Sequence, residues 1–140
     1  MSIHNRIIGY TDKETVKLDF DNIDFKQVKY WANRAYNWFE LSGFIILKSS
    51  HRNYHIMFNR TVDWSENLRI VAWVALESHN NGLHDWLIMQ CIKEASTLRV
   101  SPKNGKSSPR IVYRYGREDE EIRNYLKYRN LIKRILKRHV

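Results

Sequence analysis

The chain has 140 residues, 43% of them hydrophobic and 13% aromatic, and its 24 Lys and Arg outweigh 15 Asp and Glu to give a formal charge of +9. This length and apolar content predict one domain over residues 1–140 with a core of its own, and they exclude a disordered chain. The only cysteine, Cys91, excludes an internal disulfide and any thiolate-based zinc site. The positive charge favours a polyanionic partner, nucleic acid first, whereas the alternative is a solvated basic surface without a ligand.

No apolar run approaches the roughly 18 residues that a membrane span requires, and the N-terminal stretch MSIHNRIIGY lacks the pattern of a signal peptide. Together these features predict a soluble, cytoplasmic protein that has no membrane partner. The single cysteine agrees with an intracellular location but adds little weight to it.

The first half of the chain predicts two strands, a helix and two further strands. The strands are expected at RIIGYT (6–11), ETVKLDF (14–20), GFIILKSS (43–50) and NYHIMFN (53–59), which are rich in β-branched and aromatic residues. Apolar residues spaced by three and four predict a helix from Asp24 to Glu40, with Asp24 as its N-cap. This apolar stripe comprises Val28, Trp31, Ala32, Ala35, Trp38 and Phe39.

The second half predicts two helices, two strands and a last helix. Apolar spacing predicts a helix within residues 63–79, capped by Asp63 or Ser65, and a shorter helix at 84–95. Residues 96–116 predict a hairpin with a long loop, and a helix from about 118 to 137 has acids first and bases last, as the helix dipole favours. The order β-β-α-β-β-α-α-β-β-α predicts an α+β domain with a mainly antiparallel sheet and helices on one face.

Two carboxylates, Asp19 and Asp21, lie in the predicted strand VKLDFDN with one residue between them. Alternate residues of a strand point to one face, so both side chains reach one pocket, roughly 7 Å apart along the strand, while Phe20 packs into the core behind. Like charges this close repel unless a cation lies between them. Phosphoryl-transfer enzymes use such carboxylates to hold divalent cations; the alternative is a surface strand with two acids of no function.

The segment LKSSHRNYHIMF places one histidine, His55, inside an apolar strand. A histidine there could contact a triphosphate or the attacking hydroxyl, or it could be an ordinary core residue. No cysteine or second histidine lies at a zinc-binding spacing. The side chains that precede His55 commonly bind phosphate; they are Lys48, Ser49, Ser50, His51 and Arg52.

A basic stretch without any acid runs from Arg99 to Arg117. Arg99 and Lys103 border a predicted strand and turn, from which they could contact phosphate, although an ordinary amphipathic edge strand has the same pattern. In RIVYRYGR, tyrosines alternate with bases, which suits single-stranded nucleic acid; the alternative is tyrosines that belong partly to the core, with Ile111 on the same face. The expected nucleic-acid surface comprises Arg52, Lys106, Arg110, Tyr113, Arg114 and Tyr115.

The order of these features resembles a known family. LDFD, a helix and then KSSHRNYHIMF are similar to the first two motifs of the archaeo-eukaryotic primase superfamily, the primase-polymerases: an acid-x-acid on a strand, then a serine and a turn before a histidine on the next strand. The resemblance covers about Val16 to Arg114 and implies a compact primase-type catalytic module with an RRM-like antiparallel sheet and flanking helices. The small size resembles the minimal modules of plasmids and viruses.

By this resemblance, Asp19, Asp21 and His55 are the catalytic residues. The two carboxylates would bind Mg²⁺ or Mn²⁺, and His55 would contact the phosphates of an incoming nucleoside triphosphate. The family's third motif, an apolar residue followed by Asp, matches best at Asp85, as a third metal ligand on an expected helix; Asp63 is the alternative, or only a helix cap. The nucleotide site would also include Lys48, Ser49, Ser50, Arg99 and Lys103.

These features support four functional hypotheses. The first is a primase or polymerase-type nucleotidyltransferase of a replication system, with DNA or RNA, expected single-stranded, along the basic hairpin. The second is a non-catalytic protein that binds single-stranded nucleic acid on a degenerate form of the same fold. The weaker two are an interaction module, which would form a homodimer through the C-terminal helix or bind replication proteins, and a metal-dependent nuclease.

Overall fold

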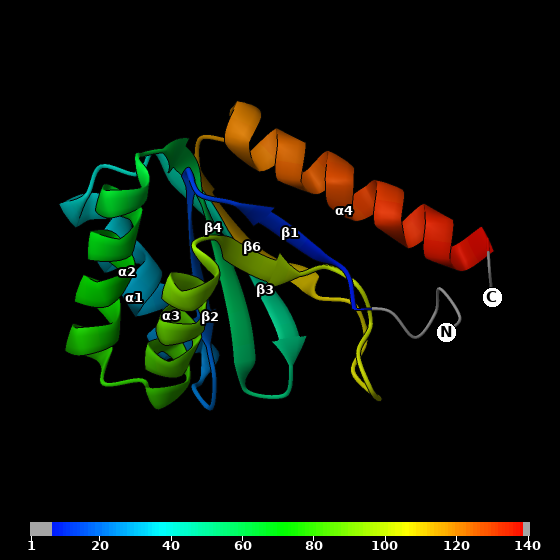
Figure 1. The fold of residues 1–140 in the computed structure, drawn as a ribbon, viewed down its shortest axis with the longest axis horizontal. Coiled ribbons are helices and arrows are strands. Elements are labelled where there is room, and N and C mark those ends of the chain that lie inside the picture. Colours follow the sequence, from blue (N-terminus) through cyan, green and yellow to red (C-terminus); the bar gives the residue numbers. More distant parts are fainter. Residues whose placement is uncertain (1–6, 139–140) are drawn as a thin grey trace.

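The structure is a computed structural model that describes residues 7–138 (Figure 1). Its strands are β1 (Gly9–Asp12), β2 (Thr15–Phe20), β3 (Gly43–Ser50), β4 (Asn53–Thr61), β5 (Ser96–Arg99) and β6 (Arg110–Gly116). Its helices are α1 (Phe25–Trp38), α2 (Trp64–Ser78), α3 (Asn81–Lys93) and α4 (Glu120–Arg138). This order along the chain is the predicted one, and the α+β class with antiparallel strands and flanking helices is confirmed. The start of the first predicted strand, at residue 6, lies outside the described residues.

Four strands form the main sheet in the order β2-β4-β3-β6, and β1 and β5 form a separate two-stranded sheet. Every pairing in both sheets is antiparallel. Because β2 lies beside β4, Asp19 is directly opposite His55. The two segments that resemble primase-polymerase motifs are therefore neighbours in the sheet.

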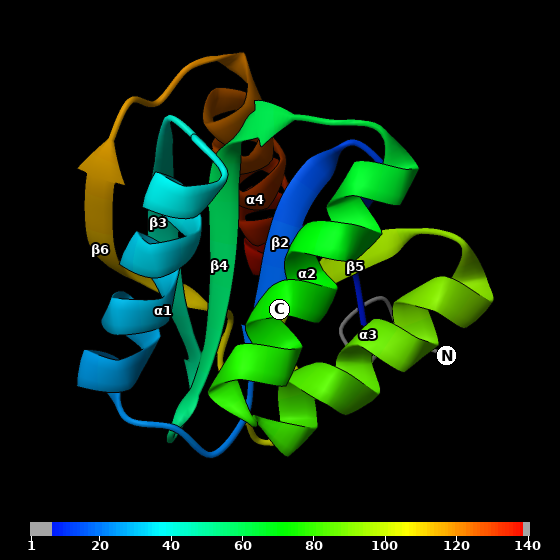
Figure 2. The same ribbon diagram turned by 90° about the vertical axis from the view of Figure 1, so that its left-hand side faces the viewer.

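Helices cover both faces of the main sheet. Its central strands carry apolar side chains on both faces, and each face has to be buried. On one face, Phe44 and Ile46 belong to the core that α1 and α2 close. On the other face, Ile45 and Leu47 pack with residues of α4. Figure 2 shows α1 and α2 in front of the sheet and α4 behind it. The prediction of helices on a single face is therefore wrong, since the continuous apolar run GFIIL requires a cover on each side.

The helices begin where the sequence provides N-caps. Asp24 and Asp63 each accept a hydrogen bond from the backbone amide three residues on, at 2.9 and 2.8 Å, and so start α1 and α2. α3 begins earlier than predicted because Asn80 caps it. No helix within residues 7–138 is long and apolar enough to cross a membrane. The side chains of α4 that are buried within the chain are Ile122, Tyr125, Arg129 and Ile132.

Residues 96–116 do not form the predicted hairpin. β5 pairs with β1 and β6 pairs with β3, so the two strands belong to different sheets. The loop 100–109 runs between the sheets and contains a small bridge between Lys103 and Lys106. Alternating residues identify a strand but not its partner, because contacts distant in the sequence decide the pairing.

A bulge in β6 changes which of its residues share a face. Ile46 lies opposite Tyr113, but its neighbour Leu47 lies opposite Ile111, so one residue of β6 has no partner. Tyr113 therefore packs on the α1 side and Ile111 on the α4 side. The prediction that Ile111 shares the tyrosine face is wrong, because strict alternation stops at the bulge.

Candidate functional site

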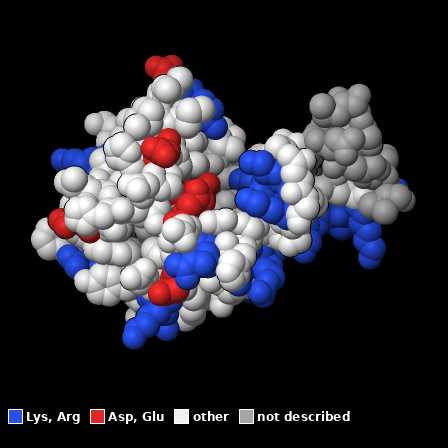
Figure 3. Space-filling model, turned by 90° about the horizontal axis from the view of Figure 1, so that it is seen from below, with Lys and Arg blue, Asp and Glu red and all other residues white. Residues whose placement is uncertain are grey.

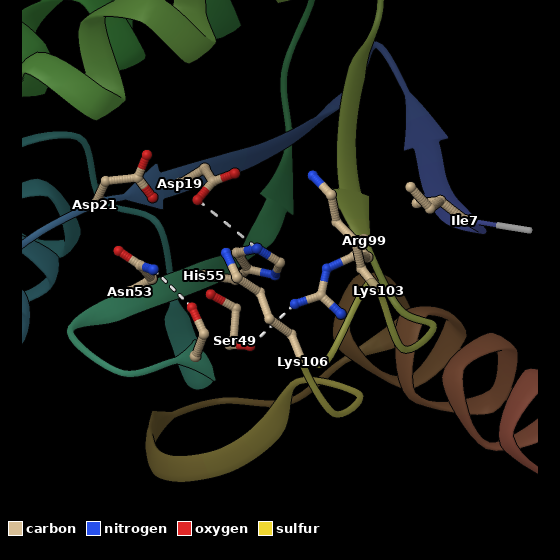
Figure 4. Close-up of a pocket in the computed structure, with 10 residues that line it drawn as sticks. Ile7, Asp19, Asp21, Ser49, Asn53, His55, Arg99, Lys103 and Lys106 are labelled. Carbon is tan, nitrogen blue, oxygen red and sulfur yellow. Dashed lines mark hydrogen bonds and ion pairs between the residues drawn. The ribbon is translucent and has the colours of Figure 1, made fainter. Parts of the chain in front are cut away.

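A polar cavity of about 240 Å³ opens on the α4 side of the main sheet, where β2, β3 and β4 meet β5 (Figure 4). Both segments that resemble primase-polymerase motifs contribute to it, and the loop 100–109 adds two lysines. Asp19 and Asp21 lie on one side of the cavity and Arg99 and Lys103 on the other, with His55 between them, and the side chain of Lys106 reaches beside His55 (Figure 4). The lining residues are Ile7, Asp19, Asp21, Ser49, Ser50, Asn53, His55, Arg99, Lys103 and Lys106.

Asp19 and Asp21 lie at the end of β2, which stops at Phe20. Phe20 is fully buried in the core against α1 and α2, as predicted, so alternation directs Asp19 to the opposite face. The Asp19 side chain is 25% exposed, and its Oδ1 lies 3.7 Å from Nε2 of His55. Both carboxylates line the cavity, and Asp21 is the more exposed of the two.

The surroundings of Asp19 disfavour its charged form. Burial, and after it the nearby charge of Asp21, raises the pKa of the Asp19 carboxyl to about 7. Arg99, Lys103 and Lys106 act in the opposite direction, because their positive charges favour the carboxylate. They do not cancel the effect of burial, so Asp19 carries only part of a negative charge near neutral pH.

His55 is buried, with 3% of its surface exposed. Burial, and after it the charge of Arg99, lowers the pKa of the imidazole to about 3, so the ring is neutral near pH 7. Its contact with Asp19 is therefore not an ion pair, although the two side chains are close. The Nδ1 atom has no hydrogen-bond partner within residues 7–138. A neutral imidazole can donate from one nitrogen and accept at the other. Nδ1 is itself buried, and Nε2 is the nitrogen on the side of Asp19.

The N-terminus of α3 fixes the backbone at Asp21. The Asn80 side chain donates to the Asp21 carbonyl oxygen at 2.7 Å and accepts from the Leu83 amide at 2.9 Å, so one residue joins the cap of α3 to the end of β2. Gly82 lies so close that a Cβ there would be 2.4 Å from the Asp21 Cβ. Neither Asn80 nor Gly82 was expected at the site: the segment NNG marks a helix start, but nothing in the sequence links it to Asp21.

Arg99 fixes the basic side of the cavity. Its guanidinium donates to the carbonyl oxygens of Ser49 at 2.9 Å and Ser107 at 3.1 Å, and also to that of Ser101. These hydrogen bonds tie the loop 100–109 to the end of β3. Because backbone oxygens already accept from several N–H groups of its guanidinium, Arg99 adds a positive charge to the cavity and holds the loop 100–109 in position.

Lys103 and Lys106 line the cavity from a two-residue turn. Their backbones exchange two hydrogen bonds, of 2.9 and 2.7 Å. The turn residues Asn104 and Gly105 have φ angles of 32° and 80°, which the Asn-Gly pair adopts at low cost. Seen from below, acidic and basic side chains lie close together near the middle of this face of the molecule (Figure 3).

A neighbouring cavity of about 220 Å³ gathers several of the other predicted residues. Its lining residues are Lys48, Ser49, Ser50, His51, Ser107 and Arg110. Ser49 and Ser50 border both cavities, whereas Lys48 and Arg110 line only the second. Arg52 lies in the turn between β3 and β4, where its guanidinium donates to Oδ1 of Asn22 at 3.2 Å.

The tyrosines of β6 lie away from the first cavity. Tyr113 packs at the edge of the core on the α1 side, and the ring of Tyr115 lies 5.3 Å from that of Tyr36 of α1. Arg114 forms an ion pair with Glu118 at 2.9 Å. These three predicted nucleic-acid contacts are therefore separated from the carboxylates, and Tyr113 takes part in the core, as the alternative interpretation expected.

Among the described residues, no third carboxylate lines the cavity. Asp85 lies on the outer side of α3, with its side chain 81% exposed, and Asp63 is the N-cap of α2. Within residues 7–138, no group of three or more His, Cys, Asp or Glu side chains is placed to hold a metal ion. Among the described residues that line this cavity, the carboxylates are those of Asp19 and Asp21.

The segments that contain Asp19 and His55 lie side by side in the main sheet, whereas Asp85 is not among the residues that line the cavity. No family model, curated protein or solved structure matches this chain.

Proposed function

We propose that the chain is a metal-dependent nucleotidyltransferase of the primase-polymerase type, which joins nucleotides from a nucleoside triphosphate to a nucleic-acid strand. The observation that carries this proposal is the composition of the first cavity, which is lined both by the carboxylates of Asp19 and Asp21 and by the cationic side chains of Arg99, Lys103 and Lys106. A nucleoside triphosphate with its metal ion needs anionic ligands for the metal and cations for the phosphates within one site. The cavity offers both.

The donor set of the acidic side fits Mg²⁺ or Mn²⁺. Mg²⁺ is commonly held by one or two carboxylates, with substrate phosphates and water completing its coordination. Asp19 and Asp21 would supply the two carboxylates, and a divalent cation would relieve the repulsion that contributes to the raised pKa of Asp19. When bound, the metal would neutralise charge on the phosphoryl group that is transferred.

The remaining lining residues would orient the triphosphate. Lys103 and Lys106 would contact phosphate oxygens as mobile point charges, while Arg99 would hold their loop in place. His55, neutral and buried beside Asp19, would donate or accept one hydrogen bond at the transferred group. A strand of DNA or RNA would supply the attacking hydroxyl.

The test is incorporation of labelled nucleotides on a primed single-stranded template with Mg²⁺ or Mn²⁺. We expect Asp19→Asn and Asp21→Asn each to lower incorporation by a factor on the order of 10² or more, because each removes a charged ligand of the transition state. Glu77→Gln, an exposed position of α2, is the matched control and keeps full activity. Undiminished incorporation by both cavity variants contradicts the proposal.

A second candidate function is favoured by the missing third carboxylate. Without a third acidic ligand among the described lining residues, the cavity is less complete than a two-metal site and suits a protein that binds single-stranded nucleic acid without catalysis. This candidate predicts salt-sensitive binding that persists in EDTA, together with no incorporation under any metal. The same assay, run beside a binding measurement, separates the two functions.

A further inference from the structure

The second cavity has a lining suited to an anion. Two cationic side chains, an imidazole and three hydroxyls surround about 220 Å³, and no carboxylate of the described residues lines it. Ser49 and Ser50 separate it from the first cavity and border both. Two cavities that carry cationic side chains thus lie next to each other at the end of β3.

The two cationic residues of this cavity are neighbours on adjacent strands. Lys48 of β3 and Arg110 of β6 are direct partners in the antiparallel register. Like charges placed directly opposite on neighbouring strands destabilise a sheet. Elsewhere on β6 such a charge is neutralised, since Arg114 pairs with Glu118, but neither Lys48 nor Arg110 forms an ion pair within residues 7–138. The repulsion between these two side chains therefore destabilises the sheet locally, and an anion bound between them would offset it.

The chemistry of the lining favours a phosphate group. The guanidinium of Arg110 can bind two oxygens of one phosphate, and the ammonium of Lys48 adds a point charge. Hydroxyls of Ser50 and Ser107 can donate to the remaining oxygens. Free phosphate and the backbone of a nucleic acid both present this group. A nucleic-acid strand is the better match, because its successive phosphates can reach both cavities at once.

We propose that this second cavity binds one backbone phosphate of a single-stranded nucleic acid whose end enters the first cavity. The inference deepens the proposed function and rests on it for the identity of the strand. It assigns Lys48 and Arg110 to the strand and leaves the incoming triphosphate to Arg99, Lys103 and Lys106. Removing the two cations should weaken the binding of the nucleic-acid strand without lowering the stability of the fold.

The experiment compares two variants with the same loss of charge. Lys48→Gln/Arg110→Gln removes the cations of the cavity, and Lys127→Gln/Arg134→Gln removes two exposed cations of α4. Binding of a labelled 12-nucleotide single strand is measured by fluorescence anisotropy in EDTA. We expect the cavity variant to lose affinity about tenfold or more, since it loses charge-assisted hydrogen bonds. Its salt slope should fall by about 0.7 for each phosphate that is no longer bound, whereas the α4 variant loses less affinity.

Thermal unfolding without ligand shows whether the cavity variant is intact. Because the substitutions relieve repulsion between like charges, we expect the cavity variant to unfold at the same temperature as the unmodified protein or higher. Weaker strand binding together with an unchanged or raised unfolding temperature identifies a binding site rather than a structural pair. Equal loss of affinity in both variants overturns the proposal, because it reduces the effect to net charge.

Inorganic phosphate, the second probe, separates the two sources of the phosphate group. NMR signals of Ser50, Ser107 and Arg110 are followed while phosphate or the unlabelled strand is added. Shifts of these signals by the strand at lower concentration than by phosphate support the proposal. Shifts by phosphate alone overturn it and identify a free-phosphate site.

The outcome is independent of the nucleotide-incorporation test. If Asp19→Asn abolishes incorporation while the cavity variant still binds the strand normally, the inference fails and the proposed function stands. If no incorporation occurs under any condition while strand binding depends on Lys48 and Arg110, the inference stands and the catalytic proposal fails.

Discussion

Lys17 and Asp19 are separated by one residue on β2 and point to the same face of the sheet, yet the protein treats their charges differently. Lys17 is fully buried, and its Nζ lies 2.6 Å from Oδ1 of Asp12 and 3.0 Å from Oγ1 of Thr15. Burial lowers the pKa of Lys17, and the ion pair with Asp12 opposes that shift. The charge of Lys17 is thus compensated inside the chain.

Among residues 7–138, Asp19 has no comparable partner. Its neighbour His55 is neutral, and the next charge along the chain, Asp21, repels it. The compensating cations, such as Arg99, lie across the cavity. A charge that the fold compensates is a structural element, whereas a charge that it leaves uncompensated at a cavity is available to a ligand. This contrast separates β2 into a structural end at Lys17, where the charge is compensated, and an end at Asp19, where it is not.

Removing Asp12 should produce the largest effect on stability. Asp12→Asn removes the counter-ion of the buried Lys17 side chain, which costs about 3 kcal/mol of unfolding free energy, as is found when one partner of a buried pair is lost. Urea denaturation monitored by circular dichroism measures this loss. Glu77→Gln, exposed on α2, serves as the control, with a change within about 0.5 kcal/mol. A comparable loss of stability in both variants would contradict a structural role for the ion pair between Asp12 and Lys17.

Removing the charge at Asp19 should have the opposite sign. Asp19→Asn keeps the shape of the side chain and eliminates the cost of a carboxylate that is buried beside Asp21. We expect a gain of about 1 kcal/mol in unfolding free energy at pH 8, typical of substitutions that relieve strain at a functional site. The same denaturation experiment applies. A loss of stability would show that Asp19, like Lys17, is compensated within the fold.

The pH dependence of that gain isolates Asp19. The pKa of its carboxyl is about 7 in the folded protein and 3.8 in the unfolded chain, so between these values the folded state binds the additional proton. Stability that depends on this proton is present below pH 4 and is lost as the pH rises toward 7. The stability difference between Asp19→Asn and the unmodified protein should therefore grow from pH 4 to pH 7 and then level off. A difference that is constant over this range contradicts the raised pKa.

The smallest expected effect is an absence of titration. Because the pKa of His55 is lowered to about 3, its ring nitrogen shifts in NMR spectra should stay at the values of a neutral imidazole between pH 5 and pH 8, apart from the small change that the titration of Asp19 causes. In the protein unfolded by urea, the same imidazole should titrate near its ordinary value of about 6.5. A titration of His55 in this range in the folded protein would make its contact with Asp19 an ion pair. The charge of Asp19 would then be compensated within the fold, as that of Lys17 is.

The element order could be predicted from the sequence because each element has a local pattern. The stripe from Val28 to Phe39 and the cap at Asp24 are sufficient for α1, and the run GFIIL is sufficient for a buried strand. The partner of β5 could not be predicted, because the loop 100–109 permits several pairings. The cover on both faces could have been inferred from GFIIL, in which consecutive residues are apolar and so both faces of the strand need burial.

The site could be predicted in part. Asp19 and His55 lie on neighbouring strands, so their proximity follows from the pairing of β2 with β4. The outward position of Asp85 could not be predicted, because it depends on where α3 begins. The register that sets Lys48 opposite Arg110 depends on a bulge, for which the sequence offers no distinct pattern.

The hydrogen bonds of Arg99 join the two sheets of the molecule, since this residue ends β5 of the small sheet and donates to Ser49 at the end of β3 in the main sheet. The acids of the first cavity come from the main sheet, while its lysines come from the loop that follows the small sheet. The width of the cavity is therefore a property of how the sheets are joined rather than of either sheet. A chain that kept every lining residue but docked the small sheet differently would keep the same side chains and lose the spacing between the carboxylates and the lysines.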